Sequence, residues 1–240
     1  MGKDTLVTRH EFLQTLHELL QPKVYLEIGV QHGWSLQLSK AALSIGVDPN
    51  PLISVPQIKH QMQGEVRIAP ITSDEFFANH DETSTGVFTS RPIDLAFIDG
   101  MHLVENALRD FANVEKYSHD RSVIVFDDVL PTTVAMATRE QCPGDWTGDV
   151  WRVYDILRER RPDLVLLLVD TQPTGVLVVM KPDPDMGPKI MDACLLYDYE
   201  YDHSRVPRVY RQIDLHDAVL DRRHALPADV VLGEIARRLT

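Results

Sequence analysis

The chain has 240 residues, of which 44% are hydrophobic and 25% charged, and its formal net charge is -12. These values are typical of a soluble globular protein with one α/β domain and modest additions, and the negative charge argues against binding to nucleic acid, whose phosphates it would repel. The two cysteines, Cys142 and Cys194, lack metal-ligand spacing. The amino terminus lacks an apolar signal core, and the longest aliphatic run, 164–169, is too short to span a bilayer. We therefore expect a cytoplasmic protein with free thiols and no membrane partner.

The predicted elements alternate between helices and strands through the first 180 residues. Thr8 and Glu11 have capping-box spacing before a helix that Pro22 ends. A glycine-bearing turn at 29–33 separates the first strand from a helix expected over 34–41. The periodicity and the turn residues predict strands at 24–28, 43–48, 66–69, 93–98, 122–126, 164–169 and 176–180, and further helices beginning at Ser73, around 108–114 and at Trp151.

The order of these elements predicts the fold. The short turn at 171–175 permits only an antiparallel hairpin, because a parallel return needs a long crossover. We therefore expect a Rossmann-like, doubly wound α/β sheet that is mostly parallel, with one antiparallel strand in a carboxyl-terminal hairpin. Residues 181–240 are expected to form a helical extension packed on domain 1–180. Its alternating aromatic and acidic stretch, 197–202, would line a ligand cleft, make a homodimer contact or form an ordinary amphipathic strand.

Two apolar strands of this pattern end on carboxylates. Strand 93–98 leads into Asp99-Gly100-Met101-His102, and strand 122–126 leads into Asp127-Asp128. If the two strands are parallel neighbours, three carboxylates and one imidazole meet at the sheet edge where ligands of open α/β sheets bind. Hard oxygen ligands there favour a divalent cation beside a reacting group. The alternative is that a strand-end aspartate only caps the following helix.

The turn after the first strand has the pattern Glu27-x-Gly29-x-x-x-Gly33-x-Ser35. Glycines there allow a ligand to approach the backbone closely, and a helix N-terminus offers free N–H groups to an anion. Asp48 ends the second strand, where an acid can accept hydrogen bonds from ribose hydroxyls. The pattern fits an adenosine-containing cofactor. Two glycines suit a small amino-acid moiety better than the pyrophosphate of a dinucleotide, although they could also merely make a tight turn.

On these residues the chain resembles the S-adenosylmethionine-dependent methyltransferases of class I over roughly 20–180. The segment 27–35 is similar to the first motif of that class. Segments 97–102 and 125–128 are similar to a narrower group, the metal-dependent O-methyltransferases that act on sugar hydroxyls of natural products and polysaccharides. The resemblance implies that Gly29, Gly33 and Ser35, with Glu27 beside them, hold the methionine part of the cofactor. It also implies ribose binding by Asp48, adenine binding by Ser73 and Asp74, and a magnesium site at Asp99, Asp127 and Asp128.

The implied reaction is methyl transfer to a hydroxyl, which is a poor nucleophile until it loses its proton. Magnesium or another divalent cation would coordinate the oxygen and lower its pKa, and either Asp99 or a neutral His102 would act as the base. Glu105 would orient the imidazole or face solvent, and Trp146 would stack on a sugar or pack in the core. The expected acceptor is a small molecule or oligosaccharide. An NAD(P)-dependent oxidoreductase and a non-catalytic binding protein of the same fold are the alternatives.

Overall fold

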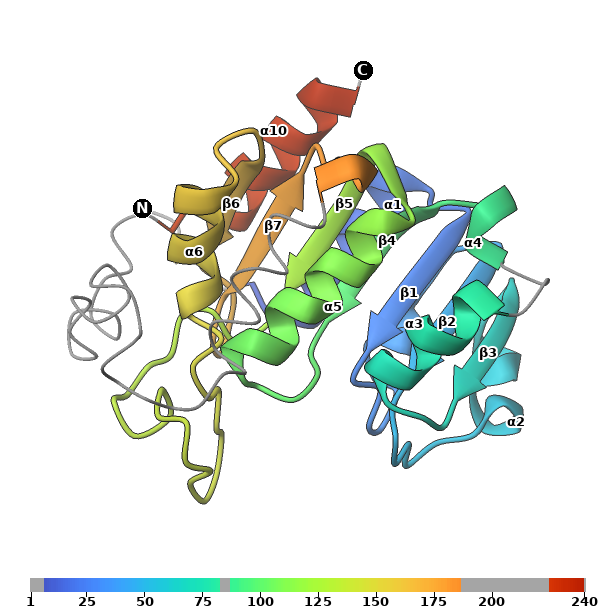
Figure 1. Ribbon diagram of the computed structural model, residues 1–240, viewed down its shortest axis with the longest axis horizontal. Helices are drawn as coiled ribbons and strands as arrows, with labels where there is room; N and C mark the ends of the chain where they lie inside the picture. Colours follow the sequence, from blue (N-terminus) through green and yellow to red (C-terminus); the bar gives the residue numbers. More distant parts are fainter. Residues whose placement is uncertain (1–6, 83–86, 187–224, 240) are drawn as a thin grey trace.

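The computed structural model describes residues 7–82, 87–186 and 225–239. Within them lies a seven-stranded sheet in the order β3-β2-β1-β4-β5-β7-β6 (Figure 1). The strands are β1 (Val24–Ile28), β2 (Leu43–Val47), β3 (Glu65–Ala69), β4 (Ile93–Ile98), β5 (Ser118–Phe126), β6 (Val165–Val169) and β7 (Val176–Met180). The α-helices are α1 (Arg9–Leu20), α2 (Val55–Ile58), α3 (Ser73–Glu82), α4 (Val87–Ser90), α5 (Val104–Lys116), α6 (Arg152–Arg160) and α10 (Ala228–Leu239).

The pairing of the strands confirms the predicted Rossmann-like sheet. β1 is parallel to β2 and β4, and β5 is parallel to β4, so β4 and β5 end side by side. β7 runs antiparallel to both of its neighbours, β5 and β6, which confirms the carboxyl-terminal hairpin. Because Ile98 pairs with Phe126, the residues that follow these two strands emerge together at the carboxyl edge of the sheet.

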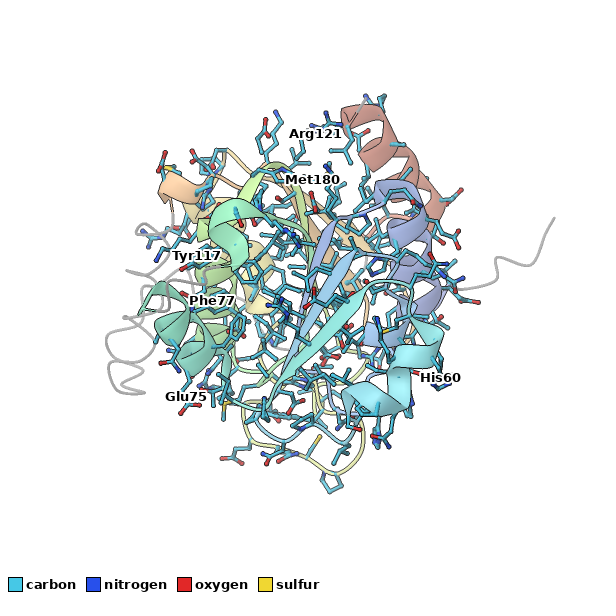
Figure 2. All side chains as sticks on the ribbon, turned by 90° about the vertical axis from the view of Figure 1, so that its right-hand side faces the viewer. His60, Glu75, Phe77, Tyr117, Arg121 and Met180 are labelled. Atoms are coloured by element: carbon cyan, nitrogen blue, oxygen red, sulfur yellow. The ribbon has the colours of Figure 1, made fainter. Side chains whose placement is uncertain are left out.

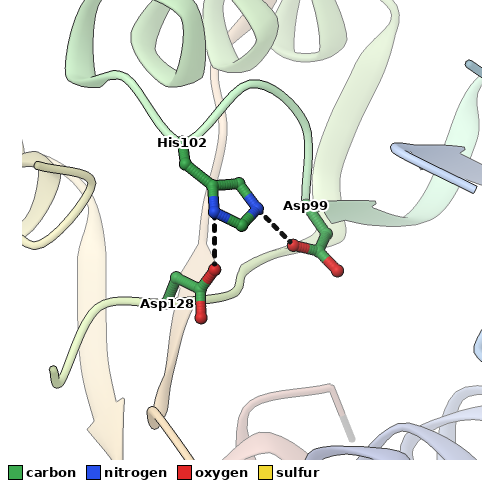
Figure 3. Close-up of side chains that lie close together, drawn as sticks. All are labelled: Asp99, His102 and Asp128. Carbon is green, nitrogen blue, oxygen red and sulfur yellow. Dashed lines mark ion pairs between the residues drawn. The ribbon is translucent and has the colours of Figure 1, made fainter. Parts of the chain in front are cut away.

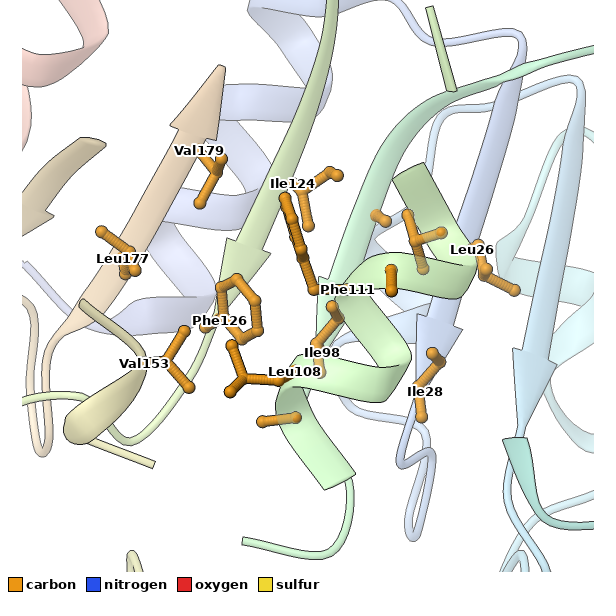
Figure 4. Packing of buried hydrophobic residues seen from close by; sticks show 14 of the residues in the cluster. Leu26, Ile28, Ile98, Leu108, Phe111, Ile124, Phe126, Val153, Leu177 and Val179 are labelled. Atoms are coloured by element: carbon orange, nitrogen blue, oxygen red, sulfur yellow. The ribbon is translucent and has the colours of Figure 1, made fainter. Parts of the chain in front are cut away.

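Helices cover both faces of the sheet. Helices α3, α5 and α6 lie on one face, and α1 and α10 lie on the other (Figure 1). Helix α5 contributes Leu108 and Phe111 to a cluster with Phe126 of β5 (Figure 4). From the side, Phe77 and Tyr117 lie on the α5 side of the sheet with their rings stacked (Figure 2). In the described ranges, no helix combines the length and the apolar character that a bilayer crossing requires.

The first helix follows the sequence prediction closely. α1 begins with a capping box, in which the Thr8 hydroxyl accepts from the Glu11 N–H and the Glu11 carboxylate accepts from the Thr8 N–H. Backbone hydrogen bonds then tie this helix start to the β6–β7 turn, because Arg9 N–H donates to the Gln172 carbonyl at 3.1 Å and Gln172 N–H donates to the Val7 carbonyl at 2.9 Å. The start of α1 therefore lies at the carboxyl edge of the sheet.

The prediction of a helix over 34–41 is wrong. Only a 3-10 turn, Leu36–Leu38, forms there, and Ser39 is already extended. The Ser39 hydroxyl accepts from the Ala41 N–H and from the Ser44 hydroxyl, so it competes for backbone groups that a helix would use. β5 also starts at Ser118, earlier than predicted, because a polar stretch extends its first half.

The carboxyl-terminal extension is described only in part. Helix α10 packs against α1 and β6, and Leu226 forms a parallel bridge with Val169. The stretch 197–202 and Cys194 lie outside the described residues. The division into a domain 1–180 and an extension 181–240 stays a prediction.

Candidate active site

A cavity of about 550 Å³ opens at the carboxyl edge of the sheet. Its walls come from the turn after β1, the loop after β2, the ends of β4 and β5, the loop before α6 and the β6–β7 turn. The lining residues include Arg9, Gly29, Asp48, Asn50, Asp99, His102, Asp128, Gln141, Asp145, Trp146 and Thr174. The position is the one where open α/β sheets bind their ligands.

Asp99, His102 and Asp128 meet in this cavity with the imidazole between the two carboxylates (Figure 3). His102 Nε2 lies 3.3 Å from Asp99 Oδ1, and His102 Nδ1 lies 3.2 Å from Asp128 Oδ2. His102 Nδ1 also lies 2.6 Å from the carbonyl oxygen of Trp146. The backbone holds both His102 and Asp128 in the left-handed region, at φ 53 and 62. This is the meeting of strand ends that the sequence predicted.

The environment of His102 favours its charged form. Burial on its own would lower the pKa, but the hydrogen bond to Asp99 and the negative charges of Asp128 and Asp99 outweigh burial and raise the pKa of His102 to about 9. In this arrangement the ring therefore carries a proton at neutral pH and donates to its neighbours. A base role for His102 requires that proton to leave first, so the choice between His102 and Asp99 as the base stays open.

Asp127, the remaining acid of the predicted cluster, is fully buried and pairs with Arg9 across 118 residues of sequence. Its Oδ2 accepts from the Arg9 guanidinium, while its Oδ1 has no hydrogen-bond partner among the described residues. Burial, followed by the charges of Asp99 and Asp128, raises the pKa of Asp127 well above its usual value, and Arg9 opposes that rise. Sequence reasoning missed Arg9, which follows a capping threonine and carries no motif.

The side chains that meet at the ends of β4 and β5 fit a divalent cation. Asp99, His102 and Asp128 each offer a ligand atom, and these atoms lie within 4.8 Å of one another. The same residues also line a second, small cavity of about 10 Å³, together with Asp127. Carboxylate oxygens suit magnesium, calcium or manganese, and an unpaired buried carboxylate oxygen close by adds to the negative potential. Asp127 as a direct ligand stays a prediction.

The glycine turn lies directly beside this cluster. Gly29 has φ 87, and a Cβ built on it would lie 1.7 Å from the Asp99 carbonyl oxygen, so only glycine allows β1 and β4 to end this close together. Asp48 stabilises the turn by accepting from the N–H groups of Val30 at 2.9 Å and Gln31 at 2.8 Å. Gly29 and Asp48 both line the cavity, so the structure brings these two predicted cofactor residues to the carboxylates.

The other residues expected to bind the cofactor are not among those that line the cavity. Glu27 is buried, accepts from the Ser35 hydroxyl at 2.8 Å and the Tyr25 hydroxyl at 2.6 Å, and has its pKa raised to about 8 by burial. Gly33 has φ 69 and is needed for the turn itself. Ser73 bonds to Asp110, and Asp74 pairs with Arg109 at 3.2 Å. In this structure these side chains support the turn and helices α3 and α5, and their cofactor roles stay predictions.

Trp146 forms part of the cavity wall next to His102. Its ring stacks on the imidazole, with centroids 5.5 Å apart and planes at 26°. The indole N–H donates to the Thr138 carbonyl at 2.7 Å. The side chain is half-buried, so it is neither a core residue nor a free surface residue. Glu105 is also mostly buried and pairs with Arg139, so the expectation that it faces solvent is wrong, and its carboxylate binds Arg139 rather than the imidazole.

Residues 26–129 match a family described as a methyltransferase domain. No curated protein matches the chain. Among solved structures, an O-methyltransferase from Bacillus cereus in complex with SAH is 18% identical, with a TM-score of 0.53, over 75% of this chain and 82% of that one. The O-methyltransferase TomG from Streptomyces achromogenes, involved in tomaymycin synthesis and bound to SAM, is 18% identical with a TM-score of 0.51 over 72% and 79% of the chains. Cofactor-bound Rv0187 from MTB is 17% identical with a TM-score of 0.52 over 75% and 84%.

The chain shares the fold of these solved structures, a Rossmann-like sheet, and its cavity lies at the carboxyl edge of that sheet. The family match assigns the segment that contains Gly29, Asp48, Asp99 and Asp128 to a methyltransferase domain. Residues 26–129 are therefore similar to a methyltransferase domain, in line with the resemblance that the turn after the first strand indicated. Nothing in the match supports the alternative of an NAD(P)-dependent oxidoreductase.

Proposed function

We propose that the chain transfers a methyl group from S-adenosylmethionine to a hydroxyl oxygen of a sugar, glycoside or oligosaccharide precursor, in a reaction that depends on magnesium or another divalent cation. The observation that supports this most strongly is the shared cavity. Gly29 and Asp48 line one part of it, and Asp99, His102 and Asp128 line the adjoining part. A sulfonium cofactor and a cation-bound hydroxyl would thereby be neighbours.

The cofactor half of the cavity suits a nucleoside that carries an amino acid. The close approach of Gly29 to the end of β4 leaves the turn without a side chain at that point. Asp48 already uses its carboxylate on backbone N–H groups, yet it remains at the cavity wall, where it can also accept from ribose hydroxyls. The four aspartates of the lining, Asp48, Asp99, Asp128 and Asp145, favour the positive sulfonium electrostatically.

The hydroxyl half of the cavity supplies the groups that this reaction needs. Asp99, Asp127 and Asp128 would hold the cation, and His102, which lies close to them, would be a further ligand once its imidazole is neutral. A bound divalent cation lowers the pKa of a coordinated hydroxyl and fixes its direction of attack. Asp99 would receive the proton, or His102 would do so after losing the proton that it carries in this arrangement. Holding the oxygen in line with the methyl group can itself supply roughly 7–11 kcal/mol of the barrier reduction.

The acceptor class follows from the resemblance of segments 97–102 and 125–128 to sugar O-methyltransferases. The polar wall formed by Asn50, Gln141 and Asp145 offers hydrogen bonds to several hydroxyl groups. Trp146 adds an aromatic surface at the same wall, against which a sugar ring could pack. We also propose, from the sequence, that the protein forms a homodimer and acts in the cytoplasm.

The experiment that tests this function is a transfer screen with methyl-labelled S-adenosylmethionine. Sugars, glycosides and catechols serve as acceptors, each assayed with magnesium and with a chelator. We expect label in a sugar or glycoside, with loss of transfer in the chelator and recovery when magnesium is restored. Transfer to catechols alone would contradict the acceptor class. Full activity in the chelator would contradict the role of the cation.

A further inference from the structure

The loop between β5 and α6 is fastened to the start of α5 by one arginine. Arg139 Nη1 donates to Glu105 Oε2 at 2.9 Å and to Asp149 Oδ2 at 2.7 Å, and Nη2 donates to Glu105 Oε1. Glu105 belongs to α5, whereas Arg139 and Asp149 belong to the loop. The side chains of all three are largely buried, so the contacts are shielded from solvent.

Asp149 has a second contact that extends this connection. Its Oδ1 accepts from the Val104 N–H at 2.9 Å, which satisfies one of the unpaired donors of the first turn of α5. The same aspartate thus caps the helix through one oxygen and binds Arg139 through the other. Because its two oxygens have different partners, the Asp149 carboxylate is held in one orientation, and residue 149 lies against the start of α5.

The segment just before Asp149 contacts His102. Gly148 has φ 58, and a Cβ built on it would lie 1.7 Å from the His102 carbonyl oxygen, so the two backbones are in direct contact. Trp146, two residues earlier, accepts from His102 Nδ1 through its carbonyl and stacks on the same ring. The position of the loop therefore sets both the cavity wall at Trp146 and the orientation of the imidazole.

We propose that Arg139 is a positioning residue for methyl transfer: by binding Glu105 and Asp149 together, it holds Trp146 and His102 in the arrangement that receives the acceptor. Arg139 is not among the residues that line the cavity, so it acts through the loop. Without it, the carboxylates of Glu105 and Asp149 remain close together in a largely buried place. Arg152, whose Nε lies 3.7 Å from Asp149 Oδ2, offsets part of their repulsion, and the remainder loosens the contact between the loop and α5. This inference depends on the proposed function for its kinetic consequences, but its structural consequence can be measured separately.

Three variants and one control test the proposal. Arg139→Ala removes the whole connection, and Arg139→Lys keeps the charge but not the fork that reaches both carboxylates. Glu105→Gln weakens the contact to α5 and leaves Asp149 in place. Arg158→Ala is the control, because Arg158 pairs with Asp155 within α6, away from the loop and the cavity. Circular dichroism establishes that each variant is folded.

The first readout is amide hydrogen exchange over 136–149. We expect exchange in Arg139→Ala to accelerate by about tenfold or more, with an intermediate effect in Arg139→Lys and Glu105→Gln and none in Arg158→Ala. The second readout is kinetic. Calorimetry should find S-adenosylhomocysteine affinity within about twofold of the wild type, while the KM for the acceptor rises by about tenfold, since the cofactor half of the cavity is not touched.

Two results would overturn the proposal. One is a folded Arg139→Ala protein whose loop exchanges at the wild-type rate. The other is an acceptor KM that does not change while cofactor affinity falls, which would place the effect in the wrong half of the cavity. If the wild-type enzyme methylates no hydroxyl acceptor, the proposed function fails, and the exchange measurement still decides whether Arg139 holds the loop.

Discussion

The ion pair between Arg9 and Asp127 is the contact whose loss we expect to be most informative. The Arg9 side chain is 27% exposed and the Asp127 side chain 0%. Water can therefore solvate part of the guanidinium but not the carboxylate, whose charge is compensated mainly by Arg9. The other carboxylate oxygen has no partner among the described residues. Arg9→Ala therefore leaves a buried negative charge next to Asp99 and Asp128 with its main counter-charge removed.

The size of the effect follows from this geometry. Removing one partner of a buried ion pair costs about 3–5 kcal/mol of folding free energy. Asp127 can relieve part of this by taking up a proton, because burial and its acidic neighbours already raise its pKa. We therefore expect Arg9→Ala to cost about 3 kcal/mol, the lower end of that range. Adding Asp127→Asn should recover at least about 1 kcal/mol, since the residues are in direct contact and the amide carries no charge.

Urea unfolding at neutral pH, followed by circular dichroism, measures these free energies. Arg67→Ala serves as the control, because Arg67 and Glu65 form a pair that is 49% and 52% exposed, worth about 0–1 kcal/mol at most. Our account of the cluster is refuted if Arg9→Ala costs no more than the control. It is equally refuted if the double variant is less stable than Arg9→Ala, since the two changes would then act independently.

Three further predictions follow from single residues. Gly29→Ala should weaken S-adenosylhomocysteine binding by about tenfold or more in calorimetry, because its Cβ would overlap the Asp99 carbonyl; unchanged binding would contradict the placement of the turn. Burial, and then the charge of Lys40, lower the pKa of His17 from 6.5 to about 4. The folded state therefore favours the neutral imidazole, and we expect the free energy of unfolding to fall by about 3 kcal/mol as the pH drops from 6.5 to about 4. His17→Phe should flatten that decline in urea titrations; an unaltered profile would exclude His17. Magnesium should raise the melting temperature of the wild type but not of Asp128→Asn, and equal shifts would place the cation elsewhere.

Much of the sheet could be predicted from the sequence because its strands are short apolar runs bounded by turn residues. The runs 93–98 and 122–126, each followed at once by aspartate, also indicated where the site would lie. Strand order then follows from the rules for parallel sheets, so the meeting of Asp99 and Asp128 needed no knowledge of side-chain packing. The Rossmann-like fold and the carboxyl-terminal hairpin were predicted correctly for the same reason.

The contacts that complete the site could not be predicted in this way. Arg9 and Asp127 are far apart in sequence, and whether they meet depends on how α1 docks on the β6–β7 turn. Arg139 lies in a loop with no periodicity, and Glu105 looks like a surface residue of an amphipathic helix until that loop covers it. Local competition explains the error at 34–41, where the Ser39 hydroxyl takes backbone partners that a helix would need.

In the proposed reaction, the carboxylates at the ends of β4 and β5 bind the cation and activate the hydroxyl beside a cofactor held by the glycine turn. The most direct test of this proposal is to measure S-adenosylhomocysteine affinity and labelled methyl transfer on the same preparation of Asp99→Asn. We predict that affinity stays within about threefold of the wild type, a difference below 1 kcal/mol, while the transfer rate falls by about a hundredfold or more. Transfer at the wild-type rate by a folded Asp99→Asn protein would contradict the proposal.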